Sequence, residues 1–320
     1  MNTAINRDTV KKAVITIVLV VAVLSAYSYL TESGLPRISL IALLLSTLVL
    51  LSGWLVSALR LRYLVGAYHG STCSLRTCIS ARFVGDVFAK ITPSSIGGEA
   101  ARAHYLSTAM GLDFLEAYAL TIYEVYFDVI LTCLVGAVVS VIFLPYSTPV
   151  LVTAVATGLI WVTTFNFIGR LVGFFNRKLL NNEYLEKSFM TKYLVKFLAY
   201  VKKFKDSYLE VSSKITPRQR AVLWALTLLT HTLWALALIP LLLLGGVVEN
   251  PDVRGIFWKS VAAYYLMQAI SILPTPGGSG VAEYGLSLAL PPSVVVSYRV
   301  VYFFVPFFIG LAVFLKYSRR

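Results

Sequence analysis

The sequence predicts an all-α polytopic membrane protein with six full transmembrane helices and two broken, re-entrant hairpins. Hydrophobic residues make up 58% of the 320 residues, and the mean hydropathy is +0.78. Only 13% of the residues are charged, whereas an average soluble domain carries roughly 25%. Long apolar runs alternate with short turns, and helix-breaking residues interrupt the apolar sequence in two places. We therefore expect a single membrane domain over residues 1–320, without a separate soluble catalytic domain.

The formal net charge of +13 does not indicate a nucleic-acid partner. The basic residues cluster in loops beside apolar spans, as expected for loops that face an anionic cytoplasmic leaflet. The cysteines Cys73, Cys78 and Cys133 have neither the spacing of a disulfide framework nor that of a metal site. We expect no metal and no cofactor.

The first two spans are predicted at about Lys12–Leu30 and Ile38–Leu59. The first has no small-residue cleavage pattern at its end, so we interpret it as a retained helix and not as a signal peptide. Basic residues precede it, which places the N-terminus in the cytoplasm. Arg60 and Arg62 are predicted to mark the cytoplasmic end of the second span.

The first break is the stretch Ile91–Arg102, which reads ITPSSIGGEAAR. Pro93 removes a backbone donor, and Gly97–Gly98 allows a sharp turn. Irregular backbone at membrane depth is tolerated only inside protein or beside a water-filled cavity, and Glu99 and Arg102 are costly there as well. Because basic residues flank this stretch on both sides, we predict a hairpin that enters and leaves through the cytoplasmic face.

The third and fourth spans are predicted at about Phe114–Leu144 and Val150–Phe174, joined by a short outer turn. Residues 170–220 then hold twelve Lys or Arg against four acidic residues, which indicates a cytoplasmic loop. Within this loop, apolar residues recur at helical spacing over Leu185–Tyr208. That pattern predicts an amphipathic helix that lies on the leaflet or packs on the cytoplasmic end of the bundle.

The fifth and sixth spans are predicted at about Ala221–Leu244 and Val294–Leu315. The turn Gly245–Asp252 after the fifth span contains Glu249 and little positive charge, so we expect it outside the cell. The second break, Leu273–Glu283, follows with the letters LPTPGGSGVAE. Basic residues at the chain end return the C-terminus to the cytoplasm.

The order of two spans, a broken hairpin and a third span occurs twice, over residues 12–144 and 150–315. Three spans separate the two hairpins, so the two halves have opposite orientations in the membrane. This is the inverted-repeat plan of secondary transporters, in which the site lies near the midplane between the repeats.

The two breaks carry a resemblance to a known family through P-x-x-x-GGE in the first and PTPGG followed by a glutamate in the second. The chain resembles the flippase-like membrane domain of lysylphosphatidylglycerol synthases and of stand-alone membrane proteins, over roughly Val14–Tyr317. Ser279 departs from the pattern, since a larger apolar residue is expected there. In the fused enzymes this domain moves a lipid between leaflets, while a soluble domain performs aminoacyl transfer. The resemblance therefore implies lipid translocation and no enzymatic activity; the lipid is open among phospholipids, modified phospholipids and polyprenyl-phosphate-linked sugars.

Glu124 and Asp128 lie four residues apart and share one face of the third span. Carboxylates at that depth are costly unless they face a cavity or find partners. A close pair would raise one pKa and make a proton carrier plausible. The alternative is a structural role in satisfying freed backbone donors or neighbouring tyrosines.

Asp86 and Lys90 are also four apart, just before the first break. They form either a simple internal ion pair or part of a site in which Lys90 and Arg102 hold a lipid phosphate with backbone N–H groups at Gly97–Gly98. Glu99 would pair with one of these cations or couple to a proton. In the second half, Glu283 could play the equivalent role with Arg299 as its partner, and His231 is expected to be a hydrogen-bonded packing residue.

The predicted function is a lipid flippase in the cell membrane that moves an anionic or polyprenyl-phosphate-linked lipid, with membrane lipids as partners and a homo-oligomer as an open possibility. Two rivals stay open: a proton- or ion-coupled solute transporter, and an intramembrane transferase that uses Glu124 or Asp128 as a base. The residues predicted to handle the headgroup are Asp86, Lys90, Pro93, Ser94, Ser95, Gly97, Gly98, Glu99, Arg102, Glu124, Asp128, Pro276, Gly277, Gly278, Glu283 and Arg299.

Overall fold

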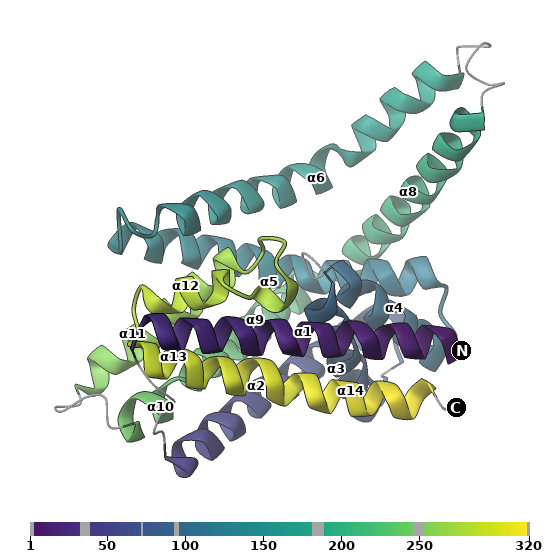
Figure 1. Ribbon diagram of the computed structural model, residues 1–320. Coiled ribbons are helices and arrows are strands. Elements are labelled where there is room, and N and C mark those ends of the chain that lie inside the picture. The colour runs from purple at the N-terminus through teal and green to yellow at the C-terminus, as the bar shows by residue number, and fades with distance from the viewer. Residues whose placement is uncertain are drawn as a thin grey trace.

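The computed structural model describes residues 3–32, 39–71, 73–92, 96–180, 189–245 and 252–318, and every regular element in these ranges is helical (Figure 1). The elements are α1 (Thr3–Leu30), α2 (Leu40–His69), α3 (Leu75–Ile91), α4 (Ile96–Met110), α5 (Phe114–Ile142), α6 (Thr148–Leu180), α8 (Phe189–Lys214), α9 (Pro217–Leu236), α10 (Ile239–Leu244), α11 (Val253–Ile270), η2 (Pro276–Gly278), α12 (Val281–Ser287), α13 (Pro292–Arg299), the π-helix η3 (Val300–Phe304) and α14 (Val305–Ser318). The predictions made for Pro93, Ser94, Ser95 and Glu249 fall outside the described residues.

Five helical segments are long and apolar enough to cross a membrane. Large apolar side chains on their outer faces are exposed, for example Leu48 and Val138, as expected for surfaces that contact lipid. The fourth predicted span, about Val150–Phe174, falls on α6, whose described apolar part is shorter, Thr148–Thr164. The five segments are Thr9–Leu30, Leu40–His69, Phe114–Ile142, Pro217–Leu244 and Pro292–Tyr317.

The prediction that Arg60 marks the end of the second span is wrong. Helix α2 continues to His69 and ends at Gly70, which has a φ of 72° and the left-handed conformation typical of a helix C-terminus. Leu61 and Leu64 extend the apolar face beyond Arg60, and all three side chains are fully buried. A buried arginine is tolerated here because it is ion-paired with carboxylates of another helix.

The first break separates two short helices that pack on each other, α3 and α4. With 17 and 15 residues, they span about 26 and 23 Å at ~1.5 Å per residue, less than the ~30 Å of a hydrocarbon core. Neither helix is therefore long enough to cross a membrane alone, and each needs the neighbouring helices to cover its ends.

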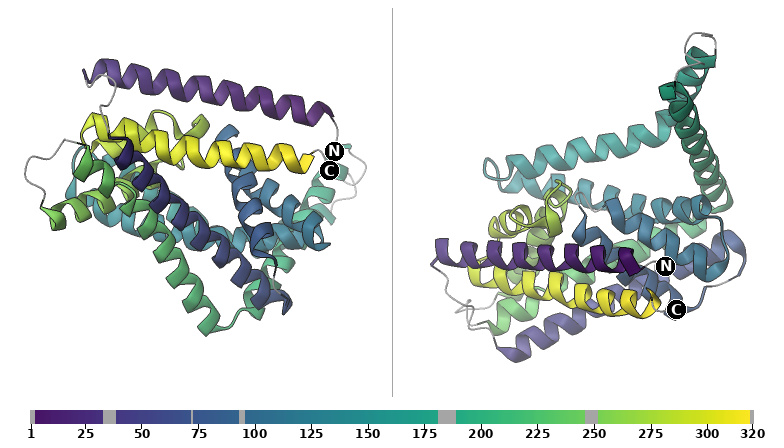
Figure 2. Two further views of the ribbon diagram at one scale, coloured as in Figure 1. Left: turned by 90° about the horizontal axis from the view of Figure 1, so that it is seen from below. Right: turned by 45° about the vertical axis from the view of Figure 1, so that its right-hand side comes forward.

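The start of α1 and the end of α14 lie at the same end of the bundle, on the right in Figure 1 and again in both views of Figure 2. The turn between α5 and α6 lies at the opposite end. Helices α6 and α8 rise away from the bundle toward the end that carries the termini. An even number of membrane crossings is consistent with this placement.

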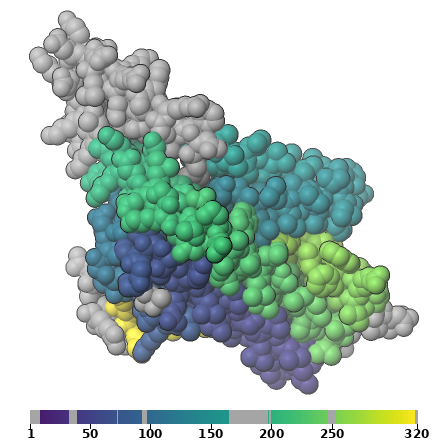
Figure 3. All heavy atoms as spheres, turned by 180° about the vertical axis from the view of Figure 1, so that it is seen from behind, coloured from purple at the N-terminus to yellow at the C-terminus, as the bar shows by residue number. Residues whose placement is uncertain are grey.

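The amphipathic helix predicted over Leu185–Tyr208 corresponds to α8, and residues 185–188 lie outside the described ranges. The last turns of α8 pack against α5, where Tyr208 contacts Tyr123 and Val211 is fully buried. Figure 3 shows this part of α8 beside α9 on the back of the molecule. These contacts fit a helix packed on the bundle, one of the two alternatives in the sequence interpretation.

The last span changes its helical form in the middle. Helix α13 passes into the π-helix η3 and then into α14, where Pro306 is the second residue. Proline has no N–H to donate to the carbonyl four residues before it, which here belongs to Tyr302. The π turn and the proline therefore leave carbonyl groups of this span available to other partners.

Candidate functional site

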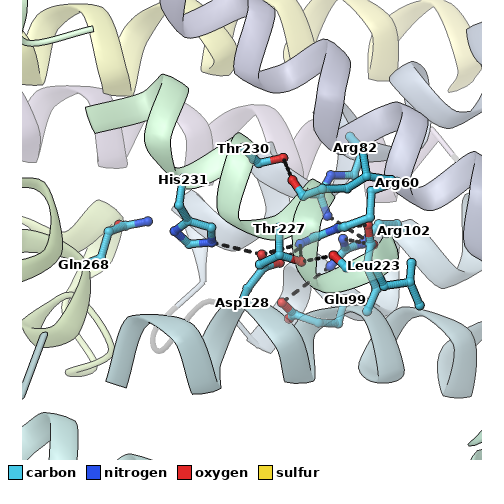
Figure 4. A network of polar contacts seen from close by, with 12 residues as sticks. Arg60, Arg82, Glu99, Arg102, Asp128, Leu223, Thr227, Thr230, His231 and Gln268 are labelled. Carbon is cyan, nitrogen blue, oxygen red and sulfur yellow. Dashed lines mark hydrogen bonds and ion pairs between the residues drawn. The ribbon is translucent and has the colours of Figure 1, made fainter. Parts of the chain in front are cut away.

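Glu124 of α5 accepts hydrogen bonds from three arginines that lie on three different helices. The distances are 3.1 Å from Arg60 Nε on α2, 3.1 Å from Arg82 on α3 and 2.9 Å from Arg102 on α4. Glu124 and Arg60 are fully buried, and Arg82 and Arg102 are 7% and 6% exposed. One carboxylate thus joins four helices inside the bundle. Figure 4 shows Arg60, Arg82 and Arg102 close together beside Asp128.

Asp128, one turn further along α5, continues the network. It accepts a bidentate pair of hydrogen bonds from Arg60 at 2.6 and 2.7 Å, and it lies 3.0 Å from His231 Nε2 on α9. The other ring nitrogen of His231 lies 2.9 Å from the Tyr264 hydroxyl of α11, to which Gln268 also donates. His231 is thus a hydrogen-bonded residue of a polar chain, as the sequence analysis expected.

Three arginines and three carboxylates balance the charge of this cluster. Glu99 on α4 is the third acid, and its Oε1 lies 3.9 Å from Arg102, the longest ion pair of the group. Buried ions are tolerated only when they are paired and hydrogen-bonded. Glu124 and Asp128 each face guanidinium groups and not one another, and the expected role of this pair as a proton carrier stays a prediction.

Two buried donors of this cluster have no acceptor. Among the described residues, no partner lies within hydrogen-bond distance of Arg82 Nε or Arg102 Nε. Both arginines line a cavity of about 210 Å³ together with Gly85, Gly98 and other residues of α3, α4 and α5. A buried, unsatisfied N–H of a charged group is costly, so this cavity is suited to an anionic or hydrogen-bond-accepting group.

A larger cavity of about 500 Å³ adjoins the first, and Glu99, Val125 and Asp128 line both. Its wall combines polar groups of α9 and α11 with apolar side chains of α5 and α6. The other lining residues are Tyr118, Ile122, Val129, Thr132, Thr157, Trp161, His231, Trp234, Gln268, Ser271 and Ile272.

The second break carries the ion pair that the sequence analysis expected between Glu283 and Arg299. Arg299 Nε donates to Glu283 at 2.6 Å, and its terminal nitrogen donates to the Gly277 carbonyl at 2.9 Å. The second oxygen of Glu283 accepts the Gly280 N–H at the start of α12. Arg299 thus ties the last span to the turn at η2, and Glu283 caps the helix that follows it.

The two breaks meet at the π-helix. Lys90 of α3 is ion-paired with Asp86 at 2.7 Å and also donates to the carbonyls of Phe303 at 3.1 Å and Tyr302 at 3.4 Å. Its ammonium group lies 5.1 Å from the centroid of the Phe303 ring, on which Arg299 also lies at 5.7 Å. All three donor positions of Lys90 are thus directed at partners within the protein.

Comparison with known proteins identifies the family. The lysylphosphatidylglycerol synthase TM region matches residues 10–313, which is nearly the whole chain. The chain belongs to this family. No curated protein matches the chain. The family assignment confirms the resemblance found at the two breaks and makes the protein a multi-pass membrane protein of a family associated with lipid modification and flipping.

The glycines of the first break in this family member have a packing role. A Cβ on Gly98 would lie 2.7 Å from Ala89 Cβ and 2.8 Å from the Gly85 carbonyl oxygen, and one on Gly97 would lie 2.7 Å from Thr92 Cγ2. Small residues at these positions let α3 and α4 approach closely. The role expected from the sequence is access of a headgroup to the backbone, and these contacts provide a different physical reason for the glycines.

The glycines of the second break have a conformational role. Pro276 opens the turn η2, and Gly277 and Gly278 have φ values of 61° and 67°, which other residues rarely adopt. A Cβ on Gly277 would also lie 2.6 Å from the Phe303 ring.

Arg60, Arg82, Tyr264 and Gln268 belong to this polar network but are not among the site residues predicted from the sequence. Arg60 and Arg82 were assigned to flanks because basic residues usually mark the ends of spans. The depth of Glu124 and Asp128 could have indicated these arginines, because two carboxylates inside a span require nearby cations.

Proposed function

We propose that this protein moves a phosphate-bearing lipid between the leaflets, and that the phosphate binds at Arg82 and Arg102. The observation that carries this proposal is that Arg82 and Arg102 line one cavity and that each has a buried guanidinium N–H without a hydrogen-bond partner among the described residues. Guanidinium groups match phosphate oxygens in geometry and charge. Family membership supports a lipid as the molecule that carries the phosphate, and the proposal includes no catalytic step.

The weak contact between Glu99 and Arg102 explains how a phosphate could bind without breaking the cluster. At 3.9 Å this pair is the loosest of the network, and Glu99 is 21% exposed, whereas Glu124 is fully buried. A phosphate oxygen would replace Glu99 beside Arg102, while Arg102 keeps its bond to Glu124 at 2.9 Å. The larger cavity beside it then accommodates the rest of the headgroup.

We also propose that the two breaks are re-entrant hairpins of an inverted repeat. Support comes from the short helices α3 and α4, and from the contacts of Lys90 and Arg299 around Phe303. Movement of one hairpin against the other around this contact would expose the cavity to one leaflet and then to the other.

Neutralisation of Arg102 together with Glu99 is expected to reduce lipid translocation by about tenfold or more, since each charged hydrogen bond to the phosphate is worth ~1.5–3 kcal/mol. The variant Glu99→Gln/Arg102→Gln removes one acid and one base, so the charge of the cluster stays balanced. The measurement is the rate at which fluorescent phospholipids become accessible to a quencher in proteoliposomes.

The matched control is Glu116→Gln/Lys203→Gln, which removes an acid from a partly buried position and a base from an exposed one, both outside the Glu124 cluster. It should translocate lipid at the wild-type rate. Wild-type translocation by the Glu99/Arg102 variant, with unchanged melting, would rule out the phosphate role. Uptake of a soluble solute by vesicles that show no lipid movement would favour the transporter alternative, and formation of a new lipid product would favour the transferase.

The second test concerns orientation. We propose that both termini face the cytoplasm, because the basic loops lie on that side. In a background without the native cysteines, Tyr146→Cys should react with a membrane-impermeant maleimide in intact cells. Lys316→Cys should react only after permeabilisation, and the reverse pattern would overturn the orientation.

A further inference from the structure

A third cavity, which shares no lining residue with the two already described, lies at the end of the bundle that carries both termini. It has a volume of about 930 Å³ and lies between the first turns of α3, the last turns of α4 and the last turns of α14. The lining residues are Arg76, Thr77, Ser80, His104, Tyr105, Thr108, Ala109, Val313, Lys316 and Tyr317. We call this cavity the terminal groove.

Each helix contributes one continuous face to the terminal groove. The residues lie at spacings of three or four positions, such as Arg76 and Ser80 on α3 or Val313 and Lys316 with Tyr317 on α14. Tyr105 and Tyr317 pack together with ring centroids 4.7 Å apart, which joins α4 to α14. Three helix faces therefore converge on one space.

The charge of the terminal groove is of one sign. Its lining includes Arg76, Lys316 and His104, which are exposed, and no carboxylate among the described residues. Within the described part of the chain, none of these three side chains forms an ion pair. This differs from the interior cluster, where carboxylates balance every arginine. Uncompensated basic groups beside hydroxyl groups are suited to an anion.

The position of the groove indicates that this anion is part of a lipid. Lys316 and Tyr317 lie at the very end of the apolar segment Pro292–Tyr317. Lysine and tyrosine at the end of a span lie at the level of the lipid headgroups, where basic residues attract anionic lipids. Val313, one turn deeper, gives the groove an apolar wall on the side of the hydrocarbon.

We propose that the terminal groove binds the phosphate headgroup of an anionic phospholipid in the leaflet next to the termini. This site is separate from the phosphate position proposed at Arg82 and Arg102, and it goes beyond translocation because binding here requires no lipid movement. Arg76 and Lys316 provide the charges, and the Ser80 hydroxyl provides a further donor to the phosphate.

Removal of the two permanent charges should weaken binding of anionic lipid to purified protein by about thirtyfold, since each basic group near a membrane surface contributes roughly 1 kcal/mol. The test variant is Arg76→Gln/Lys316→Gln. The control is Arg254→Gln/Lys259→Gln, which removes two exposed charges from α11. The measurement is native mass spectrometry with phosphatidylglycerol and with phosphatidylcholine, at matched concentrations and with inorganic phosphate as a competitor.

Selective loss of phosphatidylglycerol binding in the test variant alone supports the site. Equal loss in both double variants would mean that net charge alone attracts the lipid, which overturns the proposal. Displacement of the lipid by inorganic phosphate at low millimolar concentration would assign the groove to a soluble anion, which also overturns it.

A third variant tests whether lipid binding needs the open space of the groove as well as its charge. Ala109→Phe adds a ring to an exposed position of the lining and changes no charge. It should weaken phosphatidylglycerol binding about as much as the charge variant, and unchanged binding would mean that the lipid does not occupy the groove. Translocation at the interior site is measured independently in vesicles, so failure of one proposal leaves the other unaffected.

Discussion

Glu124→Gln is expected to destabilise the protein by about 3–5 kcal/mol, the usual cost of removing one partner of a buried ion pair. Glutamine keeps the shape of the side chain but loses its charge, and its NH₂ group faces arginine N–H donors. Three guanidinium groups from three helices would then lie close together with only Asp128 and Glu99 to balance them. Thermal unfolding in detergent micelles measures the effect as a large drop in Tm.

Glu116→Gln is the matched control for this prediction, because it makes the same change on the same helix. Glu116 is 27% exposed and lies 3.4 Å from His69, so its loss should change stability by less than about 1 kcal/mol. A wild-type Tm for Glu124→Gln would show that water reaches the arginines. A wild-type Tm combined with transport that no longer depends on pH would instead support the proton role expected from the sequence.

Gly98→Leu is expected to disrupt the pairing of α3 with α4, with a cost at or above the ~1–3 kcal/mol typical of overpacking. The first added carbon would already lie 2.8 Å from the Gly85 carbonyl oxygen and 3.2 Å from Ala89 Cα. These are backbone atoms of α3, which cannot rotate away as a side chain can. The two helices must separate, and Arg102, one turn later on α4, would move away from Glu124. The measurements are Tm and lipid translocation, and both should fall.

The milder pair Gly98→Ala and Gly158→Ala provides the control. Both glycines lie inside helices, but a Cβ on Gly158 would meet only the Cys133 side chain, at 3.3 Å. Gly158→Ala should therefore stay close to wild type, because the gain in helix propensity of ~1 kcal/mol offsets a small adjustment. A Gly98→Ala variant with a normal Tm and no lipid translocation would favour access of a headgroup to the backbone over packing.

The helical fold and the position of the first break were predictable because both depend on local sequence. Twenty or more apolar residues define a span wherever they occur. Two adjacent glycines such as Gly97–Gly98 inside apolar sequence predict a break in the helix without any knowledge of its neighbours. The extent of α2 was not predictable in this way. Arg60 is charged, and only its partners on α5 decide that the helix continues past it.

Several residues of the candidate site could be predicted from the sequence, because buried charges need partners. Which residues pair with which could be predicted only in part. Glu124 and Asp128 were identified from their depth on one helix, and the pair Glu283–Arg299 was expected from its place in the second half. Arg102 and Lys90 were expected to act together on one phosphate. They instead belong to two different clusters, because α4 brings Arg102 to Glu124 while Lys90 reaches the carbonyls that the π-helix and Pro306 leave available.

The sequence by itself determined that this protein is a helical membrane protein of a lipid-associated family, because composition, apolar periodicity and short motifs are properties of neighbouring residues. Only the tertiary structure decided which charges neutralise each other and which donors are left free. Arg82 and Arg102 are 20 residues apart in the chain, and both reach Glu124 a further 22 residues on. Ion pairs between helices depend on the direction in which each helix face points, and that direction is set by packing across the whole bundle.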